Sequence, residues 1–204
     1  MRNLCYLVIF AVILAACGSH PKMMNRTELV GYLRDQENGL VQEQQINATK
    51  VSLSYHPTSL MVSREIGDER NPSKAVIDSI EKKYSKNYYF LAKFSINGKE
   101  AIRQLGDFAR YSDMVQVLSF QMHRFVNVTT PQRDTLPLAD YFFDQTYGMS
   151  DGNTLLLCFD KEKLKDRKEL EINIAECGMG TGNLKFRFNR EDLEAVPKLK
   201  YTNQ

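Results

Sequence analysis

The sequence predicts an α+β fold that is rich in β-structure: mainly an antiparallel sheet or sandwich, with two or three short helices packed on it. Two observations support this class. Several segments alternate apolar and polar side chains, which is the period of a half-buried strand. Helical periodicity is confined to short stretches flanked by capping residues or proline. Since short loops separate the last predicted strands, antiparallel neighbours are favoured.

The first predicted elements lie between residues 27 and 55. Thr27 is a suitable N-cap for a weak amphipathic pattern of one or two helical turns. Residues 40–46 and 49–55 then face each other across Asn47-Ala48, and the second segment alternates between apolar and polar side chains. We therefore expect a short helix followed by a hairpin.

A second helix is predicted from Asn71-Pro72, because a capping residue followed by proline suits the first turn of a helix. Residues 88–96 alternate as a strand, and Asn97-Gly98 then turns the chain. We expect the helix to pack on a sheet through one apolar face, which consists of Val76, Ile77, Ile80 and Tyr84.

The middle of the chain is less clearly patterned. In residues 99–130 helix and strand both remain open, since 101–105 suggest a helix whereas 120–128 are rich in β-formers. Residues 129–150 contain two prolines and a group of aromatic side chains. We expect this segment to be a long connection folded over the core.

The C-terminal part shows the clearest strands. Residues 153–159 are apolar on both faces, as expected of a central strand, and residues 169–176 and 184–188 alternate. Because short loops join these three segments, we predict an antiparallel meander. A short helix capped by Asn189 and stopped at Pro197 is expected to close the domain.

The N-terminus carries the strongest motif of the chain. Residues 4–16 are apolar or small and follow a single positive charge at Arg2. This run has the length of the hydrophobic region of a secretory signal peptide and falls short of the roughly 20 residues that span a bilayer. It ends in Leu14-Ala15-Ala16-Cys17, which resembles the lipobox of bacterial lipoproteins. The alternatives are an ordinary signal peptide with a chance cysteine after the cut, or a buried apolar strand.

The resemblance to bacterial lipoproteins implies a covalent anchor and a location. After cleavage, Cys17 would carry diacylglycerol on its thiol and an acyl chain on its new amine, and no other cofactor is expected. Buried acyl chains contribute about 0.8 kcal/mol per CH₂, so two or three chains hold a protein at a membrane. Gly18 stands where an aspartate retains such proteins at the inner membrane, which favours the outer membrane of the cell envelope.

The expected organisation has three parts: a cleaved signal peptide (1–16), a lipidated tether (17–26) and a single globular β-rich domain (27–204). Loss of Arg2 with the signal lowers the formal net charge from +2 to +1. A charge so close to zero argues against nucleic acid as a partner.

Cys158 and Cys177 are the thiols that remain once the signal and the lipid site are set aside. In an oxidising compartment such a pair invites a disulfide, which would close a loop of about 20 residues and contribute roughly 3 kcal/mol. The alternative is two buried, unpaired thiols. The relative register of their strands decides between the two.

Residues 178–182 are rich in glycine and resemble a phosphate-binding loop. Such loops lead into a helix N-terminus, whereas a strand is expected to follow here, so a glycine-rich hairpin loop is favoured. The bare backbone at Gly180 and Gly182 would still let a partner approach closely.

The aromatic group Tyr141, Phe143 and Tyr147 is the second candidate for contact with a partner or ligand. Acids lie around it, and together they suggest a carbohydrate groove with stacking platforms: Asp134, Asp140 and Asp144. Solvated loop acids beside core aromatics are the alternative.

Motifs for catalysis are not found in the sequence. The three histidines, His20, His56 and His123, are far apart, and no nucleophile turn is present, so we expect neither a metal site nor an enzyme. An enzyme would require His56 or His123 to meet a cysteine, serine or acid in a pocket. The basic segment 161–168 is expected to be solvated or to touch anionic lipid.

Two classes of function remain. The first is a membrane-anchored, non-enzymatic lipoprotein that docks another envelope protein, as an accessory subunit of an envelope or secretion assembly or as an immunity protein. The alternative is a tethered lipoprotein that binds a glycan or a small molecule.

Overall fold

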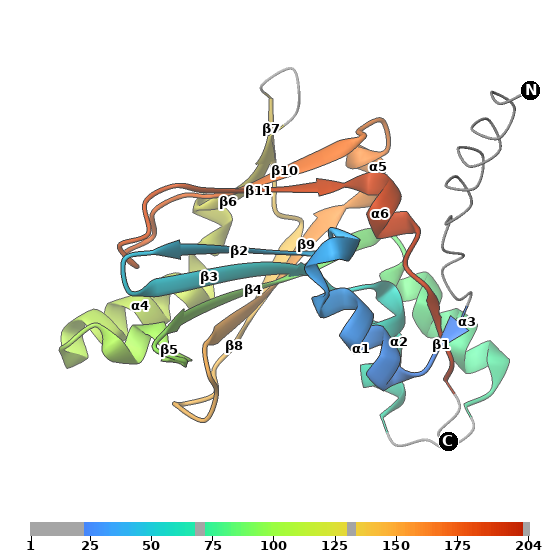
Figure 1. The fold of residues 1–204 in the computed structure, drawn as a ribbon, viewed down its shortest axis with the longest axis horizontal. Coiled ribbons are helices and arrows are strands. Elements are labelled where there is room, and N and C mark those ends of the chain that lie inside the picture. The colour runs from blue at the N-terminus through green and yellow to red at the C-terminus, as the bar shows by residue number, and fades with distance from the viewer. Residues whose placement is uncertain (1–22, 68–71, 130–133, 202–204) are drawn as a thin grey trace, which may run out of the picture.

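The computed structural model describes residues 23–67, 72–129 and 134–201, and it consists chiefly of two antiparallel sheets packed face to face (Figure 1). The large sheet has the order β2-β3-β4-β9-β8, with β5 paired to β4. The small sheet has the order β11-β10-β6-β7. The strands of the large sheet are β2 (Val41–Ile46), β3 (Thr49–Tyr55), β4 (Asn87–Ile96), β5 (Lys99–Glu100), β8 (Asp140–Asp144) and β9 (Asn153–Asp160). Those of the small sheet are β6 (Val126–Thr129), β7 (Thr135–Pro137), β10 (Glu169–Ile174) and β11 (Leu184–Asn189).

The core lies between the two sheets and is built by alternation along the strands. In β3, Val51 and Leu53 point inward and are fully buried, whereas the alternating polar residues Lys50, Ser52 and Ser54 are not. The rings of Phe90 in β4 and Phe188 in β11 meet across the interface with centroids 4.9 Å apart. Aromatic side chains of this size bury large apolar areas, so this contact is central to the packing of the two sheets.

Glutamine side chains join the two sheets along one edge. The side-chain amide of Gln42, in the edge strand β2, accepts a hydrogen bond from the Arg187 backbone N–H (3.1 Å) and donates one to its carbonyl. Gln44 donates to the carbonyl of Lys185 (2.6 Å). Unpaired backbone groups at a strand edge invite association with other chains. These glutamines satisfy part of the β11 edge and connect it to the large sheet.

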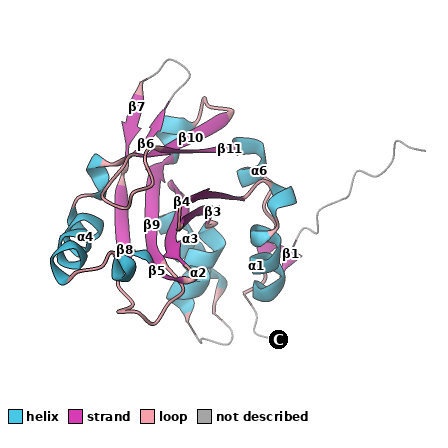
Figure 2. Cartoon of the chain, turned by 60° about the vertical axis from the view of Figure 1, so that its left-hand side comes forward, coloured by secondary structure: helices cyan, strands magenta, loops and turns pink. Residues whose placement is uncertain are grey.

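The helices gather mainly at one end of the molecule. There α1 (Arg26–Arg34), α2 (Thr58–Ile66), α3 (Lys74–Tyr84) and α6 (Arg190–Glu194) lie with the parallel strand pair β1 (Met23–Met24) and β12 (Lys198–Leu199). At the opposite end of the long axis is α4 (Phe108–Phe120), which contacts β8 (Figures 1 and 2). Shorter helical segments complete the fold: η1 (Gln36–Asn38), η2 (Ala101–Gln104), η3 (Met122–Arg124) and α5 (Lys161–Leu164).

The predicted α+β, β-rich class is confirmed. The hairpin across Asn47 forms with Asn47 at φ 53°, residues 88–96 form most of β4, and residues 153–159 form most of the central strand β9. β10 and β11 pair antiparallel, and the Asn189 side chain caps α6 as predicted.

The predicted meander of the last three long strands is wrong at its first step. β9 pairs with β4 and β8 in the large sheet, whereas β10 pairs with β11 and β6 in the small one. α5 and the turn after it therefore carry the chain from one sheet to the other. Alternation identifies strands but does not identify their partners. The short loop between β9 and β10 suggested that these strands pair with each other, but the chain crosses to the other sheet there.

Several boundaries also differ from expectation. Residues 129–150 contain β7 and β8 as well as connections, and α2 was not predicted at all. The side chain of Ser73 caps α3, while Asn71, the expected cap, lies outside the described residues. The described chain has six α-helices in place of two or three, and Met23–Met24, expected in the tether, form β1.

Candidate functional site

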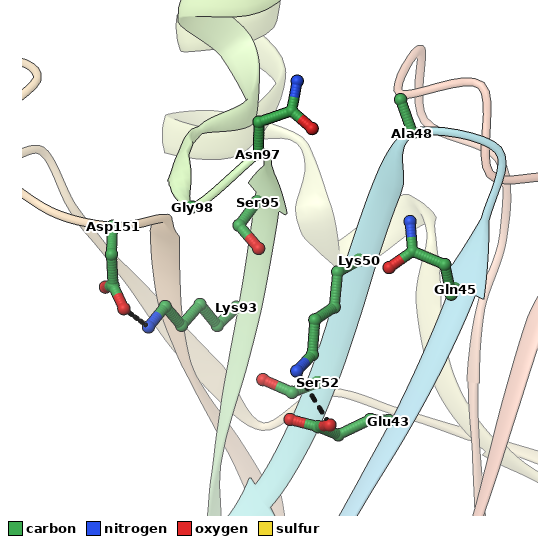
Figure 3. Close-up of a pocket in the computed structure, with 10 residues that line it drawn as sticks. All are labelled: Glu43, Gln45, Ala48, Lys50, Ser52, Lys93, Ser95, Asn97, Gly98 and Asp151. Carbon is green, nitrogen blue, oxygen red and sulfur yellow. Dashed lines mark hydrogen bonds and ion pairs between the residues drawn. The ribbon is translucent and has the colours of Figure 1, made fainter.

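A polar hollow of about 340 Å³ lies on the outer face of the large sheet, at the end where the β2–β3 hairpin turns (Figure 3). Two ion pairs cross it: Lys50 Nζ lies 2.8 Å from a Glu43 carboxylate oxygen, and Lys93 Nζ lies 2.5 Å from one of Asp151. Its remaining lining is polar or small and consists of Gln45, Ala48, Ser52, Ser95, Asn97 and Gly98.

The charges in the polar hollow are balanced. The hydrogen bond from Lys93 lowers the pKa of the Asp151 carboxyl, so this carboxylate stays ionised near neutral pH. None of the ten lining residues is a histidine or a cysteine; the titratable groups in the lining are two lysines and two carboxylates. The hollow offers polar contacts without an unpaired charge or an aromatic platform.

A second hollow, of about 390 Å³, lies beside the first on the same face and is bounded by α1 and α2. Its apolar floor comes from the sheet through Leu91 of β4, Leu156 of β9 and Phe142 of β8. The helices contribute two exposed guanidinium groups, Arg26 and Arg64. We call this the arginine hollow; its other lining residues are Val30, His56, Leu60, Met61, Asp144 and Thr154.

His56 lies in the arginine hollow as a neutral imidazole. Burial lowers its pKa to about 4, and the positive charges of Arg64 and Arg26 act in the same direction. From the sequence, His56 is a candidate for one half of a catalytic pair. The only acid that lines this hollow is Asp144, and no hydrogen bond joins the His56 ring to it within the described parts of the chain.

A third hollow, of about 480 Å³, lies at the β1–β12 end. Tyr88 donates a hydrogen bond to Glu194 (3.1 Å), and Lys161 Nζ lies 4.8 Å from the centre of the Tyr88 ring. Burial raises the pKa of Tyr88 to about 12 and lowers that of Lys161. The phenol therefore remains protonated at neutral pH, which suits a structural hydrogen bond better than acid–base chemistry.

The glycine-rich loop after β10 binds an anion, and that anion is the protein's own Glu176. One oxygen of its carboxylate accepts N–H groups from Gly178 (2.7 Å) and Gly180 (3.0 Å), and the other accepts the N–H of Gly182 (2.5 Å). Burial would raise the pKa of this carboxyl, but the backbone hydrogen bonds outweigh it and the pKa is lowered. The N–H groups that a phosphate would need are therefore already occupied.

The two thiols considered for a disulfide are free in the structure. Cys158 packs with Tyr89 and Met61 on the outer face of the large sheet, whereas Cys177 belongs to the core between the sheets. The large sheet separates them because Cys158 points to its outer face, whereas Cys177 lies in the core on its inner face. Burial raises the pKa of each thiol to about 11, so neither is a reactive thiolate at neutral pH.

The predicted aromatic contact group is divided by the fold. Phe143 is buried in the core, and Tyr141 points inward and accepts a hydrogen bond from the Met122 N–H (3.3 Å). Tyr147 remains outside, with 63% of its surface exposed. The acids around the group, Asp134, Asp140 and Asp144, are exposed, so the structure brings no row of stacking platforms together with them.

Tyr147 belongs to an apolar surface that the sequence did not indicate. Phe108 at the start of α4 is 82% exposed and its ring lies 6.3 Å from that of Tyr111. The guanidinium of Arg103 lies 5.5 Å from the Tyr111 ring and packs closely against the backbone of the loop that carries Tyr147 and Met149. Met149 is 84% exposed. We call Phe108, Tyr111, Tyr147 and Met149 the α4 patch.

The remaining predicted residues are dispersed. Cys17 and His20 lie outside the described residues, and His123 is exposed in η3. Within residues 23–67, 72–129 and 134–201, no group of three potential metal ligands comes together. Among these same residues, no helix combines the length and the hydrophobicity needed to cross a bilayer.

A scan against protein-family models, a search of the curated proteins and a search of the solved structures each found no match for this chain.

Proposed function

We propose that the chain is a lipid-anchored envelope protein without enzymatic activity, whose globular domain docks a partner protein through the α4 patch. The observation that carries this proposal is the exposure of the large apolar side chains of Phe108, Tyr147 and Met149. Arg103 connects their two segments, because it lies on the Tyr111 ring of α4 and against Gly148 of the loop. Contiguous exposed apolar groups on a soluble domain mark interaction surfaces. The proposed anchor is the acylated Cys17 of the lipobox.

The composition of the α4 patch fits a protein interface. Aromatic residues, methionine and arginine are the residue types enriched at such interfaces, and the patch with Arg103 contains all three. Glu100, only 2% exposed, holds the loop in place by accepting the Gly148 N–H (2.7 Å) and pairing with Arg103 (3.4 Å). Because the loop backbone is held from beneath, binding through Tyr147 and Met149 requires less ordering of the backbone there.

The position of the α4 patch also suits a tethered protein. Five residues separate Cys17 from Met23, so a lipid on Cys17 lies at most about 20 Å from β1. β1 and α4 lie at opposite ends of the long axis (Figure 1). The proposed anchor would therefore hold the β1 end near the bilayer and direct the α4 patch away from it, toward a partner.

The alternative of a tethered glycan-binding protein has less support. It relied on Tyr141, Phe143 and Tyr147 acting together, and only Tyr147 is exposed. The polar hollow of Figure 3 could accept a sugar, but it has no aromatic side chain in its lining.

Photo-crosslinking in intact cells tests the docking proposal. A photoreactive amino acid at position 149 should trap one envelope protein, and the same residue at position 120 is the matched control, since Phe120 is exposed on α4 but lies at its other end. We expect the 149 adduct to disappear when Phe108→Ser and Tyr147→Ser are combined. Equal adducts from both positions, or an adduct that survives the double substitution, would contradict the proposal.

A further inference from the structure

The arginine hollow combines an apolar floor with cations that come from different elements. Leu91 and Leu156 are neighbours across the β4–β9 pair, and Phe142 faces Leu156 across the β8–β9 pair. Phe142 is 54% exposed, so the apolar floor is incompletely covered by the protein itself. A volume of about 390 Å³ is within the range of small-molecule sites.

In the described part of the chain, the two arginines of the hollow form no ion pair with an acidic side chain. Neither Arg26 nor Arg64 takes part in an ion pair within 4.0 Å there, whereas the lysines of the neighbouring polar hollow are both paired. Asp144, on the β8 side, lines the same hollow and also has no such pair in these segments. The positive charge therefore lies toward the helices and the negative charge toward the edge strand.

Both arginines act electrostatically on the same group, the imidazole of His56. Both guanidinium groups lower the pKa of the same imidazole, in addition to the effect of burial. An anion between the arginines would reverse this effect, because a nearby negative charge favours the imidazolium. His56 is thus a built-in probe of what occupies the hollow.

We propose that the arginine hollow binds a small amphiphile with an anionic head group, its apolar part on Leu91, Leu156 and Phe142 and its head between Arg26 and Arg64. Arginine forms bidentate hydrogen bonds with carboxylate and phosphate groups, and it loses less hydration than lysine in doing so. The apolar floor adds affinity in proportion to the area it removes from water. This site is separate from the α4 patch, so each proposal can fail without the other.

The test compares three ligands that carry similar apolar tails and differ in the charge of the head group. The mature chain, residues 17–204 with Cys17→Ser so that no lipid of its own competes, is titrated by calorimetry with decanoate, 1-decanol and decyltrimethylammonium. We expect decanoate to bind at least about tenfold more tightly than the other two, the usual effect of a charge-assisted hydrogen bond. Butyrate, which keeps the charge and loses most of the tail, should bind weakly.

Substitutions of the arginines and the pKa of His56 provide two further tests. Arg26→Gln with Arg64→Gln should weaken decanoate binding by about tenfold or more, whereas Arg34→Gln, on the same helix α1 but outside the hollow, should not change it. Thermal unfolding of each variant checks that the fold is kept. In NMR titrations decanoate should raise the pKa of His56 from about 4, and 1-decanol should not.

Equal affinity for the three head groups, or an unchanged affinity in the double variant, would overturn the proposal. Anionic phospholipid vesicles form the last arm of the experiment. If they displace decanoate, the ligand is a membrane lipid; if they do not, it is a free amphiphile, and either result supports the anionic class.

Discussion

Replacement of Glu176 by glutamine tests how the glycine-rich loop is held. In the folded chain the Glu176 carboxylate accepts three backbone N–H groups of the loop, at 2.7, 3.0 and 2.5 Å. Glutamine keeps the shape but replaces one acceptor oxygen by an NH₂ group, which cannot accept the N–H it would face. The substitution therefore removes the charge from all three hydrogen bonds and breaks at least one.

The magnitude follows from these contacts. A hydrogen bond to a charged group contributes about 1.5–3 kcal/mol when it is well shielded, but Glu176 is exposed and water screens part of this energy. We expect Glu176→Gln to lower the free energy of unfolding by about 1.5 kcal/mol at pH 7, which is a fall of about 4 °C in the midpoint of thermal unfolding. The loop carries the buried side chains of Cys177 and Met179, so the loss extends to core packing.

The contribution of Glu176 to stability depends on pH. The pKa of Glu176 is lowered in the folded state, so its contribution is present above the unfolded pKa and is lost as the pH falls through the folded one. The difference between wild type and Glu176→Gln should therefore be largest near pH 7 and shrink below about pH 4. Chemical unfolding across this range measures it.

The matched control is Glu37→Gln, because the Glu37 carboxylate makes no hydrogen bond or ion pair with any other described residue. This variant should unfold like the wild type. If Glu176→Gln also unfolds like the wild type, or if its deficit is the same at pH 7 and pH 3, the loop is not held by this carboxylate.

Three further predictions concern the fold. Gln42→Ala should cost about 1 kcal/mol and speed hydrogen exchange of the Arg187 amide, since it removes the link to the β11 edge; unchanged exchange would contradict that link. Cys158 and Cys177 should both resist a thiol reagent at pH 8 in the folded protein and both react after denaturation without reductant, and an intact disulfide would show as a mass two daltons lower. Glu100→Gln should lower stability by about 1–2 kcal/mol and loosen the loop that carries Met149, measured by unfolding and by proteolysis; a loop that stays protected would refute the role of this carboxylate.

Local features of the fold could be predicted from the sequence. The hairpin β2–β3 follows from the turn at Asn47-Ala48 and from the alternation in residues 49–55, and α6 follows from its Asn189 cap. Alternation was less useful for pairing: the three last long strands have strong patterns, yet β9 and β10 enter different sheets. The arrangement of the strands in two sheets depends on contacts between residues that are far apart in the chain, such as Phe90 and Phe188.

The candidate sites were harder to predict because they form from distant segments. Arg26, Arg64 and Phe142 are isolated in sequence and converge only when α1, α2 and β8 reach the same sheet face. The glycine-rich loop carries a visible signal in the sequence, but the sequence analysis did not identify Glu176, two residues before the loop, as the anion that its backbone binds. An acid placed just before a glycine-rich loop is the signal that would have identified it.

Metabolic labelling tests the proposed anchor most directly. Cells producing the chain with a C-terminal tag are fed labelled palmitate, and the wild type is compared with Cys17→Ser. We expect label on the wild-type protein, recovery of that protein with the membranes, and loss of both in the variant. Equal labelling and equal membrane recovery of the two proteins would contradict it.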